Sequence, residues 1–585
     1  MKKQNLVAPA IFVLCFIIFL PFARLGIDVH HDGIVFQVAR VIARGGVIHR
    51  DVFSQYGQLS AYVDAISLKL FGFKILVLHI SSVVILSIAI AFFAESWRRM
   101  YGSFVAVASA LMCIGTAYFF LPSADYQLVA WASDKTLLLM GILSLIGTSK
   151  LINQKSGWFS IGLICVMVSS TRIQMGVCIL LMFIVFLVFS NQIRFLAPLI
   201  CGFMTLLIVA ICLMFYLDIA SEWWTQVIIW PKLFSNTVSL SNWLYALRDI
   251  FGLSSIPILL FIFVLLATFK LIARISTQFD SSKRLAQIVI ILALLLLYLR
   301  TATETSTEFW SLGRLTRFGD GGGYPHFFIN GYAILWVCFF SLIYSAPYSL
   351  LEVRKFVKQR NITGLLDRKE QTSFAQTYCL LLGIASSVQL YPLLDARHVW
   401  WALIPSTGPA FGFIISRFSP SQHRNLKVST IFLLLLVFSQ GLVSIYATTT
   451  TPRIKLEGVP IIEGSLISLV EYPGRFSSIF LAKQYLDQYQ DRPIINMCPD
   501  GIYSSLTNSI KMPDPYFVDW LNLTEDILVK DSRRQFWKLR ETFMQNHHPL
   551  VWWCDLQPRS TGEREVFTTR NKIVWLTKNL GVVRP

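Results

Sequence analysis

Titratable side chains gather in one short polar stretch of an otherwise apolar chain. Residues 24–60 directly follow the first apolar segment, and four titratable side chains fall within five consecutive positions of this stretch, namely Asp28, His30, His31 and Asp32. A membrane protein gathers such groups at a membrane exit chiefly where they handle a substrate. We therefore interpret the stretch as a catalytic loop. A polar loop that merely caps the first helix is the less favoured alternative.

Two kinds of chemistry are open to this cluster. A carboxylate at the membrane surface is partly desolvated and becomes a stronger base, so Asp28 or Asp32 can accept a proton from an acceptor hydroxyl. Alternatively, His30, His31 and Asp32 bind a divalent metal ion that holds a phosphate, or the two histidines contact the substrate directly. The residues alone leave these alternatives open.

The residues after the cluster predict two helices in the plane of the membrane, joined by a polar turn. In GIVFQVARVIARGG (33–46), apolar residues recur at helical spacing opposite polar ones, and the glycine pair ends the helix. A second helix is expected over 58–71. The turn contains the candidate substrate-binding residues Arg50, Gln55 and Tyr56, because Gln and Tyr hydrogen-bond sugar hydroxyls. A plain helix-breaking turn is the alternative.

Further polar groups lie between apolar runs. They are Arg172 with Gln174, and Asp395 with Arg397 and His398. Charges at membrane depth are costly and usually mark function, and the fork-shaped guanidinium of Arg172 suits a lipid phosphate. Snorkelling of the side chain to the surface is the alternative. Asp134 and Lys135, at the start of another run, make a weaker case.

The composition indicates a polytopic membrane protein. Of 585 residues, 55% are hydrophobic and 14% are charged, and the mean hydropathy is +0.59; soluble proteins are roughly a quarter charged. The net charge of +18 does not indicate a nucleic-acid partner, because Lys and Arg crowd the loops expected to face the cytoplasm and its anionic lipid. About 13 apolar runs, from 6–23 to 428–447, approach the length needed to span the bilayer.

The basic residues also orient the chain. With the N-terminus in the cytoplasm, an odd number of spans places residues 448–585 outside, on the same face as the loop 24–72. We predict an α-helical transmembrane domain over 1–447 and a small soluble extracytoplasmic α/β domain over 448–585. Cys498 and Cys554 each follow a predicted strand of that domain. A disulfide between them is predicted, with two separate buried thiols as the alternative.

The order of these features resembles the GT-C class of integral-membrane glycosyltransferases, which includes the protein O-mannosyltransferases and the bacterial aminoarabinose transferases. Three segments carry the similarity: DVHHDG…HRDVFSQYGQLSAY, YPLLDARHVWWALIP and PIINMCPDGIYSSLTNSIKMPDPYF. The resemblance implies a multi-pass protein of the bacterial inner membrane and a sugar donor carried on a polyprenyl phosphate. It also implies a cell-envelope or protein acceptor, with no cofactor beyond the divalent metal ion left open above.

The resemblance further implies that the first-loop carboxylate is the general base, which by position is Asp28. The chain departs from better-known members by having His30, His31 and Asp32 where they often carry Glu, so Asp28 and Asp32 both remain candidates. Arg172 corresponds loosely to a donor-phosphate contact. The competing hypotheses are a transporter or flippase of lipid-linked saccharides, a saccharide ligase or polymerase, and a non-catalytic assembly protein.

Overall fold

The structure is a computed structural model, and only part of the chain is described. The described residues are 6–24, 31–117, 133–229, 231–232, 339, 341–351, 353–355, 368–390 and 396–416, together with eight short strands between 454 and 583. The predicted spans near 251–272, 285–300 and 428–447 lie outside these residues. The total of about 13 spans therefore stays a prediction.

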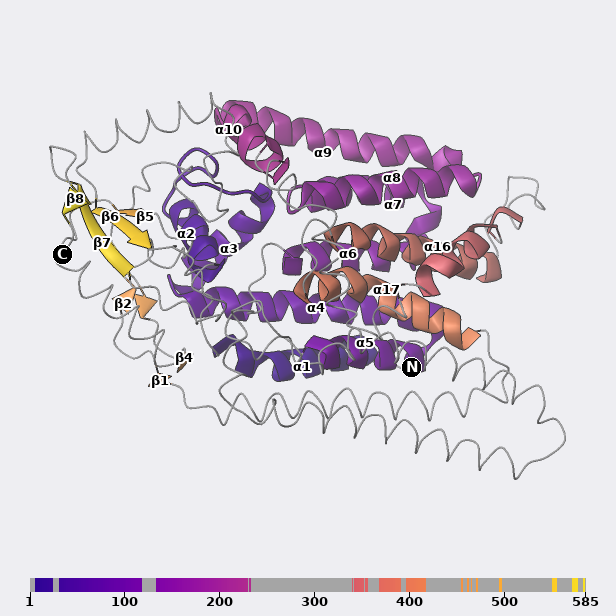
Figure 1. Cartoon of the computed structure of the whole chain (residues 1–585). Helices are drawn as coiled ribbons and strands as arrows, with labels where there is room; N and C mark the ends of the chain where they lie inside the picture. The colour runs from indigo at the N-terminus through magenta and orange to yellow at the C-terminus, as the bar shows by residue number, and fades with distance from the viewer. Residues whose placement is uncertain are drawn as a thin grey trace, which may run out of the picture.

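Long apolar helices run side by side and form a bundle (Figure 1). The helices of this bundle are α1 (Val7–Phe19), α4 (Ile75–Tyr101), α5 (Ser103–Ala117), α6 (Ser133–Gly147), α7 (Lys155–Ser169), α8 (Ile173–Phe189), α9 (Leu196–Tyr216), α16 (Arg368–Ser386) and α17 (Ala396–Ser416). Among the described residues, three segments are long and apolar enough to cross a membrane: Ile75–Tyr101, Ile193–Tyr216 and His398–Ser416. Shorter apolar helices pack around them, so the described part of the chain has the helical architecture of a membrane protein.

Short helical turns connect these elements. They are η1 (Leu20–Arg24), η2 (Lys150–Asn153), η3 (Ile193–Phe195), α10 (Ala220–Trp224), the π-helix η4 (Thr225–Ile229) and η5 (Ser387–Leu390). The bundle has two distinct ends. One end carries α2 (His31–Ala43) and α3 (Gln58–Phe71), and the N-terminus lies at the other (Figure 1).

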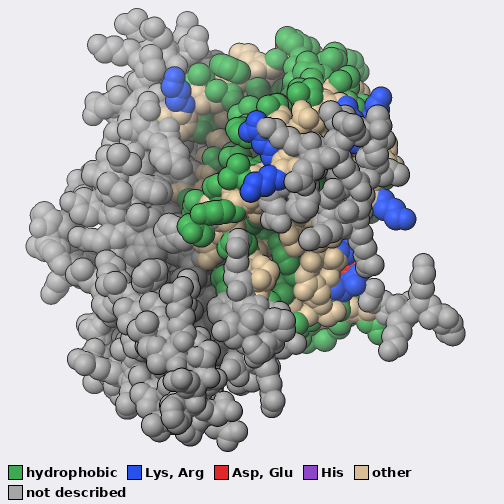
Figure 2. Space-filling model, turned by 90° about the vertical axis from the view of Figure 1, so that its right-hand side faces the viewer, with side chains coloured by type: hydrophobic (Ala, Val, Ile, Leu, Met, Phe, Trp, Pro, Cys, Tyr) green, Lys and Arg blue, Asp and Glu red, His purple; other side chains and the backbone are tan. Residues whose placement is uncertain are grey.

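The end opposite α2 and α3 is basic. Figure 2 looks onto it and shows Lys and Arg side chains spread over the described part of this face. The helix ends and turns here contain Arg98, Arg99, Lys150, Lys155 and Arg194. The end with α2 and α3 also contains basic residues, among them Arg44, Arg50, Lys69 and Lys74, so the orientation of the chain in a membrane stays a prediction.

Both helices expected in the first loop are present. The second has the predicted bounds, Gln58–Phe71, and the first ends at Ala43, before Gly45 adopts a left-handed φ of +92°. The polar side of the first helix is buried. Gln37 and Arg40 are both covered, and Arg40 Nη2 donates a hydrogen bond to Gln37 Oε1. α2 is therefore enclosed on its polar side as well as on its apolar side.

The second helix, α3, has exposed apolar residues, as expected of a helix at a membrane interface. α3 packs against α2 and α4, while Ile66, Leu70 and Phe71 near its end are exposed. Exposed apolar residues at the end of a bundle suit the boundary between headgroups and acyl chains. α3 thus packs one side against the protein and exposes apolar residues on the other, and its placement in the membrane plane stays a prediction.

The tail contains short strands. They are β1 (Ile454–Lys455), β2 (Pro460–Ile461), β3 (Gly464–Ser465), β4 (Val470–Glu471), β5 (Ile494–Asn496), β6 (Leu550–Cys554), β7 (Asn571–Leu576) and β8 (Val582–Val583). A four-stranded sheet has the order β5-β6-β7-β8, with β5 parallel to β6 and the other pairs antiparallel. The helices expected in this tail lie outside the described residues, so the α/β domain stays a prediction.

Candidate functional site

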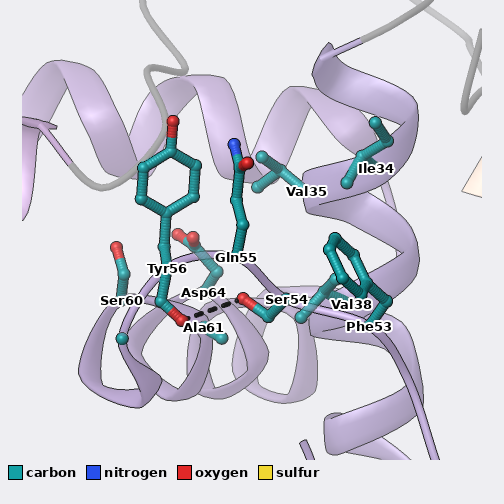
Figure 3. A pocket seen from close by; sticks show the side chains of 11 residues that line it. Ile34, Val35, Val38, Phe53, Ser54, Gln55, Tyr56, Ser60, Ala61 and Asp64 are labelled. Atoms are coloured by element: carbon teal, nitrogen blue, oxygen red, sulfur yellow. Dashed lines mark hydrogen bonds between the residues drawn. The ribbon is translucent and has the colours of Figure 1, made fainter. Parts of the chain in front are cut away.

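A cleft of about 40 Å³ lies between α2 and α3 at the end of the bundle. Its lining comes from one face of each helix and from the turn between them: Ile34, Val35, Val38, Phe53, Ser54, Gln55, Tyr56, Gly57, Ser60, Ala61 and Asp64. Figure 3 shows the side chains of Gln55 and Tyr56 rising beside the carboxylate of Asp64, with Ile34 and Val35 on the α2 side. Ser54 Oγ donates a hydrogen bond to the carbonyl oxygen of Tyr56 at 3.1 Å, which shapes the turn.

Backbone contacts hold the cleft against the bundle. The N–H of Gly57 donates to the carbonyl of Thr171 at 3.2 Å, and the N–H of Leu59 donates to that of Ser170 at 2.9 Å. A Cβ at position 57 would lie 2.2 Å from the oxygen of Ser170, so only glycine permits this approach. The start of α3 is therefore joined directly to the turn between α7 and α8.

Three charged side chains form a buried cluster beside the cleft. Lys135 Nζ lies 2.7 Å from Asp64 Oδ1 and 3.0 Å from Asp134 Oδ2, and all three side chains are at most 5% exposed. Burial raises the pKa of Asp64 to about 6, because Lys135 only partly offsets the loss of hydration and Asp134 opposes ionisation. Asp64 belongs to both the cluster and the lining of the cleft.

Arg172 lies next to this cluster. Its Nη2 donates to Ser133 Oγ at 2.7 Å, and its guanidinium lies over the rings of Tyr56 and Trp401, 5.3 Å and 5.5 Å from their centroids. The side chain is buried, as expected of a guanidinium with aromatic faces on two sides. Arg172 therefore connects the turn that lines the cleft to the first residue of α6 and to α17.

Asp32 forms a second buried pair. Its Oδ2 lies 3.2 Å from His79 Nε2, and His79 Nδ1 lies 2.8 Å from the carbonyl oxygen of Ala23. The carbonyl can only accept, so Nδ1 carries a proton and Asp32 lies against the other nitrogen. This pair connects the start of α2, which immediately follows residues 25–30, to the first turns of α4.

Gln226 holds the turn between α2 and α3 in place. Its Nε2 donates to the carbonyl oxygen of His49 at 2.7 Å, and its Oε1 accepts from the N–H of Ser54 at 3.0 Å and lies 3.0 Å from His49 Nδ1. His49 and Gln226 are fully buried, and His49 has a left-handed φ of 70°. One amide side chain on η4 thus holds His49 and Ser54, at the two ends of the segment that leads to Gln55 and Tyr56 in the cleft.

The buried imidazole makes stability depend on pH. Burial lowers the pKa of His49 to about 4, although the Gln226 hydrogen bond partly raises it. In the unfolded chain His49 is protonated below about pH 6.5, whereas in the folded protein it stays neutral down to about pH 4. Its contribution to the free energy of unfolding is therefore full above about pH 6.5 and is lost as pH falls toward 4.

We expect His49 to account for a loss of about 2 kcal/mol in stability between pH 7 and pH 5. Melting temperatures of the detergent-purified protein at both pH values measure the change. His49→Asn provides the comparison, because Asn tolerates a left-handed φ and does not titrate. If the melting temperature of His49→Asn falls between pH 7 and pH 5 as much as that of the wild type does, His49 is not the group responsible.

The structure brings together only some of the residues predicted from the sequence. Gln55 and Tyr56 line the cleft, Arg172 contacts Tyr56, and Asp32 is buried at the same end of the bundle. The half-buried His398 ring lies 5.2 Å from the ring of Trp401, whose own ring contacts Arg172. These residues come from segments far apart in the sequence: the first loop, the start of α8 and α17.

Other predicted residues lie apart or outside the described residues. Arg50 is exposed and pairs with Asp51, and Gln174 is exposed in the first turn of α8, so neither reaches the cleft. The structure does not describe the side chains of Asp28, His30, His31, Asp395, Arg397, Cys498 and Cys554. The described residues contain no group of three or more His, Cys, Asp or Glu side chains able to hold a metal ion. The disulfide and the metal set with His30 and His31 stay predictions.

Sequence reasoning missed Asp64 and His79. Asp64 stands in a helical pattern where a polar residue is unremarkable, and His79 stands inside an apolar run. Lys135 was given too little weight, although a lysine at the start of an apolar run must find a partner. The signal for Asp64 was its place on α3 one turn after Ser60 and two turns after Gly57, on the face that lines the cleft.

Comparisons with known proteins define no family for the chain. No protein-family model matches it. No curated protein matches it either. Among solved structures, a crystal structure of the Archaeoglobus fulgidus oligosaccharyltransferase in complex with Zn and sulfate matches with a TM-score of 0.40 and 13% sequence identity, over 85% of this chain. This chain spans 57% of the length of that one. A likeness of this size carries no argument about the fold or activity of the present protein.

Proposed function

We propose that this protein is a membrane glycosyltransferase that moves a sugar from a polyprenyl phosphate to an acceptor hydroxyl on the extracytoplasmic face. The observation that carries the proposal is a gathering of buried groups at one end of an apolar bundle. Asp32, Arg172 and the cleft with Gln55 and Tyr56 all occur there. The apolar helices offer the surface that a polyprenyl chain needs, and the polar end offers groups for the reacting atoms.

The proposed reaction needs a base and a cation. The acceptor oxygen forms a bond to the anomeric carbon, the bond from that carbon to the phosphate oxygen breaks with its electron pair leaving on phosphate, and the hydroxyl proton passes to a carboxylate. Asp28 and Asp32 are the candidates for that carboxylate, and Arg172 is the candidate for stabilising the departing phosphate. A divalent ion, if held by His30, His31 and Asp32, would supply charge to the same phosphate.

The pairing of Asp32 with His79 suits a base that must be held in place. The imidazole lies against one carboxylate oxygen and is itself oriented by the Ala23 carbonyl. In this arrangement His79 is a positioning residue, and Asp32 or the neighbouring Asp28 receives the proton. The extracytoplasmic tail over 448–585 is proposed to contribute to acceptor binding from the same side.

The test replaces each candidate base with Asn in the full-length chain. We expect Asp28→Asn, Asp32→Asn or both to lower glycosyl transfer by about 10²–10⁴-fold, the usual contribution of a general base. Cells lacking the gene are supplied with each variant, and their cell-envelope glycans and glycoproteins are analysed by mass spectrometry while protein levels are monitored. Asp51→Asn is the matched control, because Asp51 is a partly exposed first-loop carboxylate outside the cleft. Wild-type products from both variants would overturn the catalytic role of the loop.

A further inference from the structure

The side of the cleft formed by α3 carries polar groups that neither the base nor the phosphate contact uses. Ser60 and Asp64 lie one helical turn apart on the same face of α3, and both line the cleft. Both are nine-tenths or more buried, at 5% and 3% exposure. Figure 3 shows them on the same side of the cleft as the ring of Tyr56.

The hydroxyl of Ser60 has no hydrogen-bond partner among the described residues. A buried hydroxyl without a partner costs free energy, so its position requires an explanation. Hydroxyl groups donate and accept at once, and a ligand that does the same would satisfy Ser60. The unpartnered group is thus an observation independent of the neighbouring charges.

The charges point to the same kind of ligand. Lys135 lies between two carboxylates, and the buried guanidinium of Arg172 lies next to the same cluster. Asp134 Oδ1 has no hydrogen-bond donor among the described residues. Of the two carboxylates, Asp64 lines the cleft, where ligand hydroxyls would donate hydrogen bonds to it.

The remaining lining matches one edge of a sugar ring. The ring of Tyr56 offers an aromatic face, Gln55 offers an amide that donates and accepts, and Val35 and Val38 give an apolar wall. A cleft of about 40 Å³ holds about three water-sized groups at roughly 10–15 Å³ each. Two or three adjacent hydroxyls fit this size, and the rest of a sugar would lie outside the cleft.

We propose that Ser60 and Asp64 form a subsite for adjacent sugar hydroxyls, with Lys135 holding the Asp64 carboxylate in place. The hydroxyls donate to Asp64 and exchange hydrogen bonds with Ser60 while the ring lies against Tyr56. The inference rests on the proposed glycosyl transfer for the identity of the ligand as a sugar. It assigns discrimination among sugars to α3, apart from the base and the phosphate contact.

The test separates sugar binding from lipid-phosphate binding. The full-length protein in nanodiscs is titrated with farnesyl phosphate and with farnesyl phosphates that carry glucose, galactose, mannose or arabinose, and tryptophan fluorescence reports binding. For the wild type, at least one sugar-bearing probe is expected to bind about tenfold or more tightly than farnesyl phosphate. Asp64→Asn is expected to remove that advantage and to leave the Kd for farnesyl phosphate within about twofold.

Ser60→Ala gives a second, milder variant in case Asp64→Asn folds poorly. It deletes a hydroxyl that has no partner among the described residues, so folding should be retained, and a loss of about three- to tenfold is expected for the preferred sugar probe alone. Asp51→Asn is the control and should bind every probe as the wild type does. A merely structural role would instead weaken all probes together and lower the melting temperature in parallel.

Two results would overturn the inference: no preference of the wild type for any sugar-bearing probe over farnesyl phosphate, or an unchanged preference in Ser60→Ala and in folded Asp64→Asn. Failure of the proposed transferase is a separate result. Suppose that neither the wild type nor any variant changes the cellular glycans, but Asp64→Asn loses only the preference for the sugar-bearing probe. The sugar subsite is then supported and the proposed transfer reaction is not.

Discussion

Replacing Lys135 with Met is expected to lower the free energy of unfolding by about 3–5 kcal/mol. The change leaves Asp64 and Asp134 buried next to each other without the ammonium group that contacts both, at 2.7 Å and 3.0 Å. Removing one member of a buried ionic cluster strands the others, and here the two that remain repel. Thermal unfolding of the detergent-purified protein measures the effect.

A double variant distinguishes stranded charge from lost packing. Lys135→Met combined with Asp64→Asn should recover a substantial part of the stability, because one of the two unpaired carboxylates is gone. Lys155→Met is the matched control, since Lys155 is exposed at the start of α7 and should change stability by less than about 0.5 kcal/mol. A single variant as stable as the wild type would show that the cluster is not buried as described.

Gln226→Ala is the second substitution with a large expected effect, about 3 kcal/mol or more. The amide group makes three contacts of 2.7–3.0 Å with the turn: the carbonyl and ring of His49 and the N–H of Ser54. All these groups are buried, so each loses its partner without gaining water. The turn that carries Gln55 and Tyr56 into the cleft should loosen as a result.

Two measurements check this role of Gln226. The melting temperature of Gln226→Ala should fall, and limited proteolysis should cut between residues 44 and 57 faster than in the wild type. Gln174→Ala is the control, because Gln174 is exposed in the first turn of α8. If the turn in Gln226→Ala is as resistant as in the wild type, other contacts hold it and Gln226 is dispensable.

Local patterns in the sequence predicted local structure well. The bounds of α3 followed from Gly57 and an apolar period, and the end of α2 followed from Gly45 and Gly46. The burial of Arg40 could not be predicted in this way. A helical period shows which side of a helix is apolar, but it says nothing about what covers the polar side.

The site shows the same limit. Gln55, Tyr56 and Arg172 were predicted because polar residues beside apolar runs are conspicuous. Asp64 and His79 were missed because their significance comes from partners far away in the sequence, Lys135 for the first and Asp32 for the second. Contacts of this kind depend on how whole helices pack, which composition and spacing do not specify.

The contact between Gly57 and the turn at Ser170 bears on how the protein could change over evolutionary time. The start of α3 is held by main-chain N–H groups and carbonyls, and this contact requires that position 57 has no side chain. Substitutions in the surrounding wall therefore leave the alignment of the scaffold intact, provided this glycine is kept. Such a separation of anchor from lining permits drift toward new ligands while the geometry is inherited unchanged.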